Sequence, residues 1–160
     1  MKCKARLESY LQDNEVAYQS QHHPTAYTAQ TVAAADHVGG KSLAKVVMAM
    51  ADGRLAMLVV DAPHKVNFTK VATALQAEVR LAHEEEFVDS FPDCEVGAMP
   101  PFGNLFNLPT YVDRGLAEEE TIYFKAGTHT DTMSIAYADF ARLVKPKVAD
   151  LTAETAATRS

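Results

Sequence analysis

One stretch of the sequence decides the fold: LAKVVMAMADGRLAMLVV, residues 43–60. Its two apolar halves predict β-strands over 43–51 and 55–60. The Asp52-Gly53 pair between them predicts a tight hairpin, because both residue types tolerate a positive φ. Both faces of the first strand are apolar, which is typical of a strand covered on both sides. Residues 43–60 therefore predict a hairpin that lies inside the domain.

The segments around this hairpin alternate between helix and strand patterns. Helices are predicted near 7–13, 28–36, 68–75, 84–91 and 138–144, and further strands at 16–20, 79–81, 110–112, 121–125 and 132–136. Most of the strands are linked by hairpins, and helices come between groups of strands, so the predicted class is α+β with a mixed, largely antiparallel sheet. We expect residues 1–148 to form one domain and the small, polar residues 149–160 to fray as a tail.

The composition is that of a globular protein. The chain has 160 residues, of which 48% are hydrophobic and 22% charged, and its formal net charge is −6. No apolar run is long enough for a membrane span and no signal-peptide core follows Met1, so a cytoplasmic location without a membrane partner is predicted. Cys3 and Cys94 are too few to indicate a disulfide framework, and we expect both to be free thiols.

Charge is distributed unevenly along the chain. Residues 39–80 carry an excess of Lys and Arg, whereas residues 83–120 are strongly acidic. The basic part could face a phosphate backbone, and its candidate contacts are Lys41, Arg54, Lys65 and Lys70. The acidic total excludes a strongly basic nucleic-acid binder, and DNA is not an expected partner.

Lys45 is the strongest candidate for a chemical role, because it interrupts an apolar strand. A lysine is rarely buried in such a place without a partner or a function. One interpretation is that its ammonium holds a carbonyl or phosphate oxygen, or acts as an amine of lowered pKa. The other is that Lys45 lies near the strand end and extends its ammonium to water.

Two loops could form a pocket with this lysine. The first is VGAMPPFG, residues 96–103, whose two prolines make a stiff bend that neither a helix nor a central strand can absorb. The second is the turn at 127–131, which carries His129. Together with Lys45 these loops predict the walls of a small pocket.

Other motifs are weaker. Gly39-Gly40-Lys41-Ser42 resembles the end of a phosphate-binding loop, but a helix is predicted before it and a strand after it, the reverse of what that loop needs. His22 and His23 would point to opposite sides of an extended segment and would not chelate a metal together. Nothing near Cys94 indicates an activated thiolate. We therefore predict neither a metal nor a cofactor.

Four segments together resemble the YbaK/EbsC family of aminoacyl-tRNA deacylases, which includes the editing domain of bacterial prolyl-tRNA synthetase. They are LAKVV at 43–47, FPDCEVGAMPPFG at 91–103, LPTYVD at 108–113 and FKAGTH at 124–129. The resemblance covers about residues 16–147. It implies a compact α+β domain with a curved mixed sheet, and hydrolysis of the ester that joins a wrong amino acid to the terminal ribose of tRNA.

The resemblance also implies site residues. Lys45 takes the place of the family's functional lysine, which engages the substrate near the ester. The pocket wall would come from the first loop and the second loop, through Gly97, Met99, Pro100, Pro101, Phe102, Gly103, Gly127 and His129. The size of the chain fits a free-standing member that clears mischarged tRNA, with a synthetase as a further candidate partner.

Two positions depart from the family pattern. Val46 follows the lysine where alanine-editing relatives have asparagine and the cysteine-editing type has threonine, and Ser20 stands where the cysteine-editing type has tyrosine. The amino acid removed is therefore left open. An alternative function is a non-catalytic module of the same fold that binds a small molecule or a synthetase.

Overall fold

The computed structural model describes residues 2–22 and 43–153. Its helices are α1 (Cys3–Asp13), α3 (Phe68–Leu75), α4 (Glu84–Phe87), α5 (Arg114–Ala117) and α6 (Tyr137–Val144), with short 3₁₀ turns at Val88–Ser90 and Gly103–Phe106. Its strands are β1 (Gln19–His22), β2 (Ala44–Ala51), β3 (Arg54–Asp61), β4 (Val79–Leu81), β5 (Thr110–Asp113), β6 (Thr121–Lys125), β7 (Asp131–Ala136) and β8 (Lys147–Ala149).

The strands form two sheets. Five strands follow the order β4-β2-β3-β5-β8, and three follow the order β1-β7-β6. The β3–β5 and β5–β8 pairs are parallel, and the other pairs are antiparallel. An isolated parallel bridge between Leu43 and Tyr123 links the two sheets at the start of β2. The prediction of a mixed, mostly antiparallel α+β fold is confirmed.

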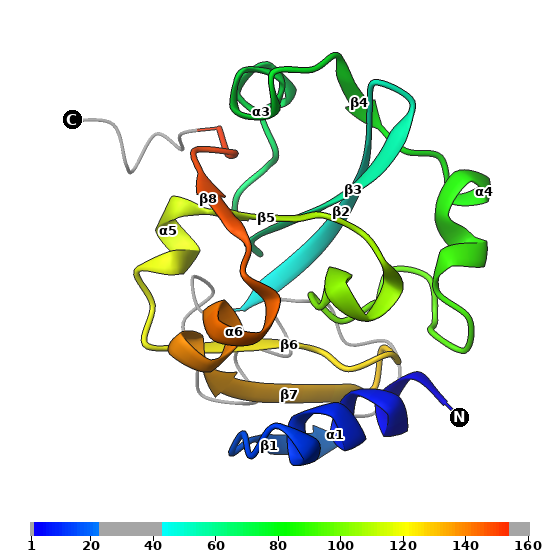
Figure 1. Ribbon diagram of the computed structural model, residues 1–160, viewed down its shortest axis with the longest axis vertical. Helices are drawn as coiled ribbons and strands as arrows, with labels where there is room; N and C mark the ends of the chain where they lie inside the picture. Colours follow the sequence, from blue (N-terminus) through cyan, green and yellow to red (C-terminus); the bar gives the residue numbers. More distant parts are fainter. Residues whose placement is uncertain (1, 23–42, 154–160) are drawn as a thin grey trace.

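The central hairpin forms as its sequence predicts. Ala51 pairs with Arg54 across a two-residue turn, in which Asp52 and Gly53 have φ values of 49° and 81°. Successive residues of β2 contribute to different clusters of buried side chains. Met48 faces the main core, whereas Ala49 joins a second cluster with Val71 of α3. Figure 1 shows α3 over the five-stranded sheet, while α1 and α6 lie by the three-stranded sheet.

Most helix predictions are confirmed, with local corrections. Asn67 caps α3 by accepting hydrogen bonds from the backbone N–H groups of Thr69 and Lys70. The helix predicted at 84–91 is α only to Phe87 and then tightens into a 3₁₀ turn before Pro92. Sequence patterns missed α5 and β8, which are too short to show a period. The helix predicted at 28–36 and the Gly39–Ser42 loop lie outside the described residues.

The prediction of a tail that frays from residue 149 is wrong for residues 149–153. Leu151 is fully buried, and its backbone N–H donates to Oδ1 of Asp113 at 2.8 Å. Thr152 pairs with Val66 in an isolated antiparallel bridge. A single leucine in a polar segment gives little sequence signal, but here it completes the cluster beneath α3.

The prediction of free thiols is also wrong. Cys3, the first residue of α1, forms a disulfide with Cys94, and their Cα atoms are 5.1 Å apart. The two residues are 91 positions apart in the sequence, so no local pattern could pair them. The bond joins α1 to the segment that precedes the first predicted pocket loop.

Within residues 2–22 and 43–153, no helix has both the length and the apolar character needed to cross a bilayer.

Asp131 joins α1, β1 and β7. It is buried at the start of β7, where its Oδ1 lies 3.1 Å from both Nζ of Lys4 and Nδ1 of His22. Thr128 donates to the other oxygen. Burial raises the pKa of Asp131, but the hydrogen bonds of Thr128, His22 and Lys4 outweigh it and hold the pKa at about 2. His22 thus belongs to a hydrogen-bonded cluster around Asp131, and His23 lies outside the described residues.

We expect Asp131→Asn to lower the free energy of unfolding by about 2 kcal/mol at neutral pH. The folded-state pKa is below the ordinary value of 3.8, so the ionised carboxylate stabilises the fold above that value and the contribution is lost as the pH falls toward 2. Urea unfolding at pH 7 and at pH 2.5 measures the difference. An equal gap between wild type and variant at both pH values would contradict this assignment.

Candidate functional site

A small cavity lies where the two sheets meet. It has a volume of about 60 Å³ and lies beside the start of β2 and the end of β6. Its lining residues are Leu43, Ala44, Lys45, Val46, Ala62, Gly97, Met99 and Lys125. Three predicted site residues, Lys45, Gly97 and Met99, are therefore brought together by the fold.

The ammonium of Lys45 is only partly exposed to water. Burial lowers its pKa below the usual lysine value, Asp61 raises it, and Lys65 lowers it again. Lys45 lies near the start of β2, as the second interpretation expected, but its ammonium is partly desolvated, as the first interpretation expected. Such an ammonium can hold an oxygen atom more strongly than an ammonium in bulk water, because the local dielectric constant is lower.

The two predicted pocket loops are held together by backbone hydrogen bonds. The N–H of Glu95 donates to the carbonyl oxygen of Gly127 at 2.8 Å, and the N–H of Gly127 donates to Ala98 at 2.9 Å. The Glu95 carboxylate accepts from the N–H of His129 at 2.7 Å. Gly97 has a φ of +86°, which a side chain would disfavour. The turn at 127–131 therefore fixes the loop that carries Gly97 and Met99.

His129 lies behind this loop rather than among the cavity-lining residues. Its Nε2 is 2.7 Å from the carbonyl oxygen of Val96, and its Nδ1 is 3.2 Å from Nζ of Lys125. Because a carbonyl oxygen only accepts, Nε2 carries a proton and donates to Val96, while Nδ1 accepts from the Lys125 ammonium. The ring thus joins Lys125 to the pocket loop.

The second half of the first loop lies beneath the cavity. Pro100, Pro101, Phe102 and Gly103 are buried and are not among its lining residues. The Phe102 ring is inside the core, with its centroid 5.5 Å from that of Phe124 and 5.7 Å from that of Phe140. Contact of these residues with a substrate stays a prediction. These residues support the wall that Gly97 and Met99 form.

Gly127 faces the disulfide instead of the cavity. A Cβ atom added at this residue would lie 2.8 Å from both Cβ and Sγ of Cys3, and the φ of Gly127 is +97°. A larger residue would therefore displace the N-terminus of α1. The structure thus shows a close approach between the turn and α1 at Gly127, and contact of Gly127 with a substrate stays a prediction.

The predicted phosphate contacts do not form one patch. Arg54 is exposed at the β2–β3 turn. It lies six residues along β3 from Val60, the residue that pairs with Lys45, or about 20 Å at the usual strand rise. Lys65 is exposed near Lys45. Lys70 is already engaged by Asp150 and by the carbonyl oxygen of Thr152. Lys41 lies outside the described residues.

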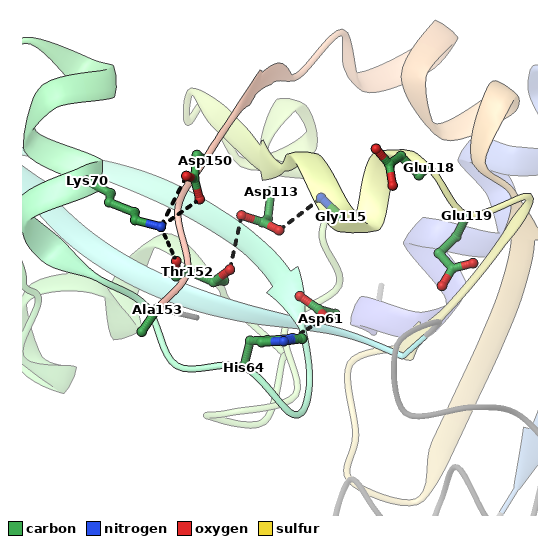
Figure 2. A pocket seen from close by; sticks show the side chains of 10 residues that line it. All are labelled: Asp61, His64, Lys70, Asp113, Gly115, Glu118, Glu119, Asp150, Thr152 and Ala153. Atoms are coloured by element: carbon green, nitrogen blue, oxygen red, sulfur yellow. Dashed lines mark hydrogen bonds and ion pairs between the residues drawn. The ribbon is translucent and has the colours of Figure 1, made fainter. Parts of the chain in front are cut away.

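Lys70 belongs to a second, wider cavity of about 430 Å³ at the carboxyl ends of β3, β5 and β8 (Figure 2). Five carboxylates line it, from Asp61, Asp113, Glu118, Glu119 and Asp150. Asp113 accepts hydrogen bonds from Gly115, Leu151 and Thr152 and so holds the tail in place. The negative charge of this cavity disfavours a phosphate, so Lys70 is poorly placed to contact a tRNA backbone.

Lys125 is the charged cavity residue that sequence reasoning missed. It ends β6 after the alternating buried residues Ile122 and Phe124, and such a position is typical of an exposed lysine. The FKAGTH segment contained it, but only the contact between the two sheets brings it to the same cavity as Lys45. Burial lowers the pKa of the Lys125 ammonium.

Comparison with known proteins identifies a matching family for most of the chain. Residues 23–143 match the family described as the aminoacyl-tRNA editing domain. No curated protein matches the chain at a significant level.

Several solved structures share the fold. A candidate trans-editing enzyme for prolyl tRNA synthetase is 20% identical, with a TM-score of 0.83 over 96% of this chain and 99% of that one. The hypothetical protein APE2540 is 19% identical, with a TM-score of 0.83 over 92% of this chain and 99% of that one. A scaffold protein used to present linear epitopes is 18% identical, with a TM-score of 0.84 over 97% and 99%. At these identities the likeness concerns the fold.

Proposed function

Because this chain belongs to the aminoacyl-tRNA editing domain family, we propose that it is a free-standing deacylase that hydrolyses the ester between a small, mischarged amino acid and tRNA. Membership confirms the family resemblance seen in the sequence. The observation that carries the proposal is the shared cavity of Lys45, Gly97 and Met99. It places an ammonium beside an exposed, bent backbone in a partly apolar environment.

The proposed reaction needs no protein nucleophile, because an aminoacyl ester is already reactive. A water molecule attacks the carbonyl carbon, and the carbonyl electron pair moves to its oxygen. The tetrahedral intermediate then collapses with cleavage of the bond to the ribose oxygen, which takes up a proton. In this scheme Lys45 orients the ester and stabilises the negative oxygen, and a ribose hydroxyl can assist the attacking water.

Selectivity would depend on size. The cavity of about 60 Å³ accepts a group of only a few atoms, and Met99 narrows it. A pocket gains only about 1–3 kcal/mol from one methylene, so a second site that admits small amino acids is a useful complement to a synthetase. Val46 also lines this cavity, so its branched side chain would contribute to the choice of amino acid.

The proposed partners follow from the reaction. The substrate is a mischarged tRNA, which places the protein in the cytoplasm, and the fold match to a candidate enzyme for prolyl tRNA synthetase supports a link to that synthetase. Lys65 and Arg54 remain the proposed contacts for tRNA phosphates. In the cytoplasm the Cys3–Cys94 disulfide would be exposed to thiol reductants.

The test is deacylation of tRNAs charged with Ala, Ser, Thr, Cys or Pro. We expect wild-type protein to hydrolyse at least one of these esters above the spontaneous rate. Lys45→Ala should lower kcat/KM on that ester by on the order of 100-fold, as the loss of one charge-stabilising donor does in other enzymes.

Lys147→Ala is the matched control, because Lys147 is exposed on β8 and is not among the cavity-lining residues. It should retain wild-type activity. Absence of hydrolysis with all five tRNAs would contradict the deacylase proposal and favour a binding module. Hydrolysis that survives Lys45→Ala would reject the role of Lys45 alone.

A further inference from the structure

We propose that Lys125 is a second cationic residue of this site, which acts with Lys45 on the oxygen that becomes negative during ester hydrolysis, and that His129 positions it. The inference rests on the proposed function and deepens it. It assigns to Lys125 direct contact with the substrate, and to His129 a role behind the cavity.

Lys45 and Lys125 occupy matching positions relative to the bridge between the two sheets. Leu43 and Tyr123 form a parallel bridge. Lys45 lies two residues after Leu43, and Lys125 lies two residues after Tyr123. Because side chains alternate along extended segments, residues two positions beyond a bridged pair lie on the same side as that pair. Lys45 and Lys125 therefore project from neighbouring segments toward the same side, and both line the same cavity.

The Lys125 ammonium is partly buried and lies beside His129. No salt bridge joins its ammonium to a carboxylate in the described part of the chain, and its hydrogen-bond contact there is Nδ1 of His129. Burial lowers its pKa without a compensating acidic group, in agreement with this geometry. Two partly buried ammonium groups beside one small cavity stabilise a negative charge that develops there, because that charge offsets the cost of burying them.

His129 fixes the direction of the Lys125 side chain. Its Nε2–H donates to Val96, one residue before Gly97, so the acceptor Nδ1 faces Lys125. Glu95 accepts from the backbone N–H of His129 and holds the other end of the turn. A flexible lysine thus receives one preferred position relative to the loop that forms the cavity wall, which lowers the entropy lost when it engages the reacting oxygen.

The cavity favours the ester over a phosphodiester as the group between the two lysines. A water molecule needs about 10–15 Å³ of such space, so 60 Å³ holds only a few atoms. Leu43, Val46 and Met99 make part of the wall apolar, which suits a neutral ester that gains charge only as it reacts. Lys125 should therefore affect the rate of the chemical step more than substrate binding.

Steady-state deacylation provides the first measurement. We expect Lys125→Met, which keeps the length of the side chain without its charge, to lower kcat by 10-fold to 100-fold with KM within about twofold of wild type. Lys125→Arg should recover part of the rate, and the control Lys147→Met should match wild type. A rise in KM at unchanged kcat would overturn the proposal in favour of a phosphate contact, and unchanged kinetics would overturn it outright.

Binding of two substrate analogues separates this inference from the proposed function. One is a phosphonate analogue of 3′-alanyl adenosine, whose anionic tetrahedral group imitates the intermediate, and the other is the neutral 3′-amide. Lys125→Met should weaken binding of the phosphonate at least 10-fold and leave the amide within twofold. Equal effects on both analogues would overturn the role on the oxyanion. If neither analogue binds wild type, the proposed function itself fails.

Nitrogen-15 NMR and two substitutions of His129 test whether this residue positions Lys125. In the wild type, ¹⁵N chemical shifts should show Nε2 protonated and Nδ1 as acceptor, and Lys125→Met should move the Nδ1 signal. His129→Gln, which can retain an acceptor, should keep more of kcat than His129→Ala. Equal losses in these two variants, with an unmoved Nδ1 signal, would contradict the positioning role.

Discussion

Phe102→Ala is expected to lower the free energy of unfolding by about 3–5 kcal/mol, the range for loss of a buried aromatic ring. The ring is fully buried and makes edge contacts with Phe124 of β6 and Phe140 of α6. Tyr10 of α1 packs on it with a centroid distance of 6.3 Å. One side chain thus joins three elements of the main core, and its removal leaves a space that none of them can fill alone.

Urea or thermal unfolding measures this loss. Because it is a large part of the stability of a typical domain, Phe102→Leu provides a milder change, with an expected loss of about 1–2 kcal/mol. Val96→Ala is the control in the same loop, since Val96 is 39% exposed and should change stability by less than about 0.5 kcal/mol. Similar stabilities of Phe102→Leu and Val96→Ala would contradict the assignment of Phe102 to the core.

Loss of the Cys3–Cys94 disulfide is the second large expected effect. The bond closes a loop with a sequence separation of 91, for which the chain-entropy model gives about 4–5 kcal/mol, and removal of native disulfides costs about 2–5 kcal/mol. The double variant Cys3→Ser, Cys94→Ser should therefore unfold at a lower temperature than the oxidised wild type. Detachment of α1 from the turn at 127–131 should contribute to this loss of stability, because Cys3 packs on Gly127.

Thermal unfolding with and without a dithiol reductant tests this expectation. The reductant should lower the Tm of wild type to near that of the double variant and should leave the Tm of the double variant unchanged. The double variant thus controls for effects of the reductant on the rest of the molecule. A wild-type Tm that does not respond to complete reduction, verified by thiol titration, would contradict the expected stabilisation.

Phe102 and the Cys3–Cys94 disulfide support the cavity wall and are not among the residues that line the cavity. Phe102 lies three residues after Met99, and Cys94 lies three residues before Gly97, so the cavity wall is held at both ends by buried or covalent contacts. A reacting group is positioned well only when the residues around it are themselves fixed. Loss of either support should therefore also reduce deacylation, in proportion to the disorder of the wall.

The local parts of the fold could be predicted from the sequence. Asp52-Gly53 specified the hairpin, Asn67 specified the start of α3, and the apolar faces of β2 specified a strand covered on both sides. Each of these signals depends on residues close in the chain, whose backbone preferences and spacing act locally. The correct family was indicated by resemblance alone, through the segments at 43–47, 91–103, 108–113 and 124–129.

Contacts between distant segments could not be predicted in this way. Leu151 has no periodic neighbours, so its burial depends on α3 and on Asp113, which accepts from its backbone N–H. The disulfide depends on α1 crossing to the segment around Cys94. The assignment of Phe102 to the core, and not to the pocket surface, likewise depends on rings from α1, β6 and α6.

By itself the sequence determined most of the strands, the central hairpin, the family and the lysine around which a site could form. Only the tertiary structure decided that Lys125 shares the cavity with Lys45, and that His129 holds Lys125 instead of lining the cavity. The physical reason is that strand patterns specify which side of its own strand a residue occupies, whereas the bridge between Leu43 and Tyr123 sets the register between two sheets. That register depends on the packing of the whole core.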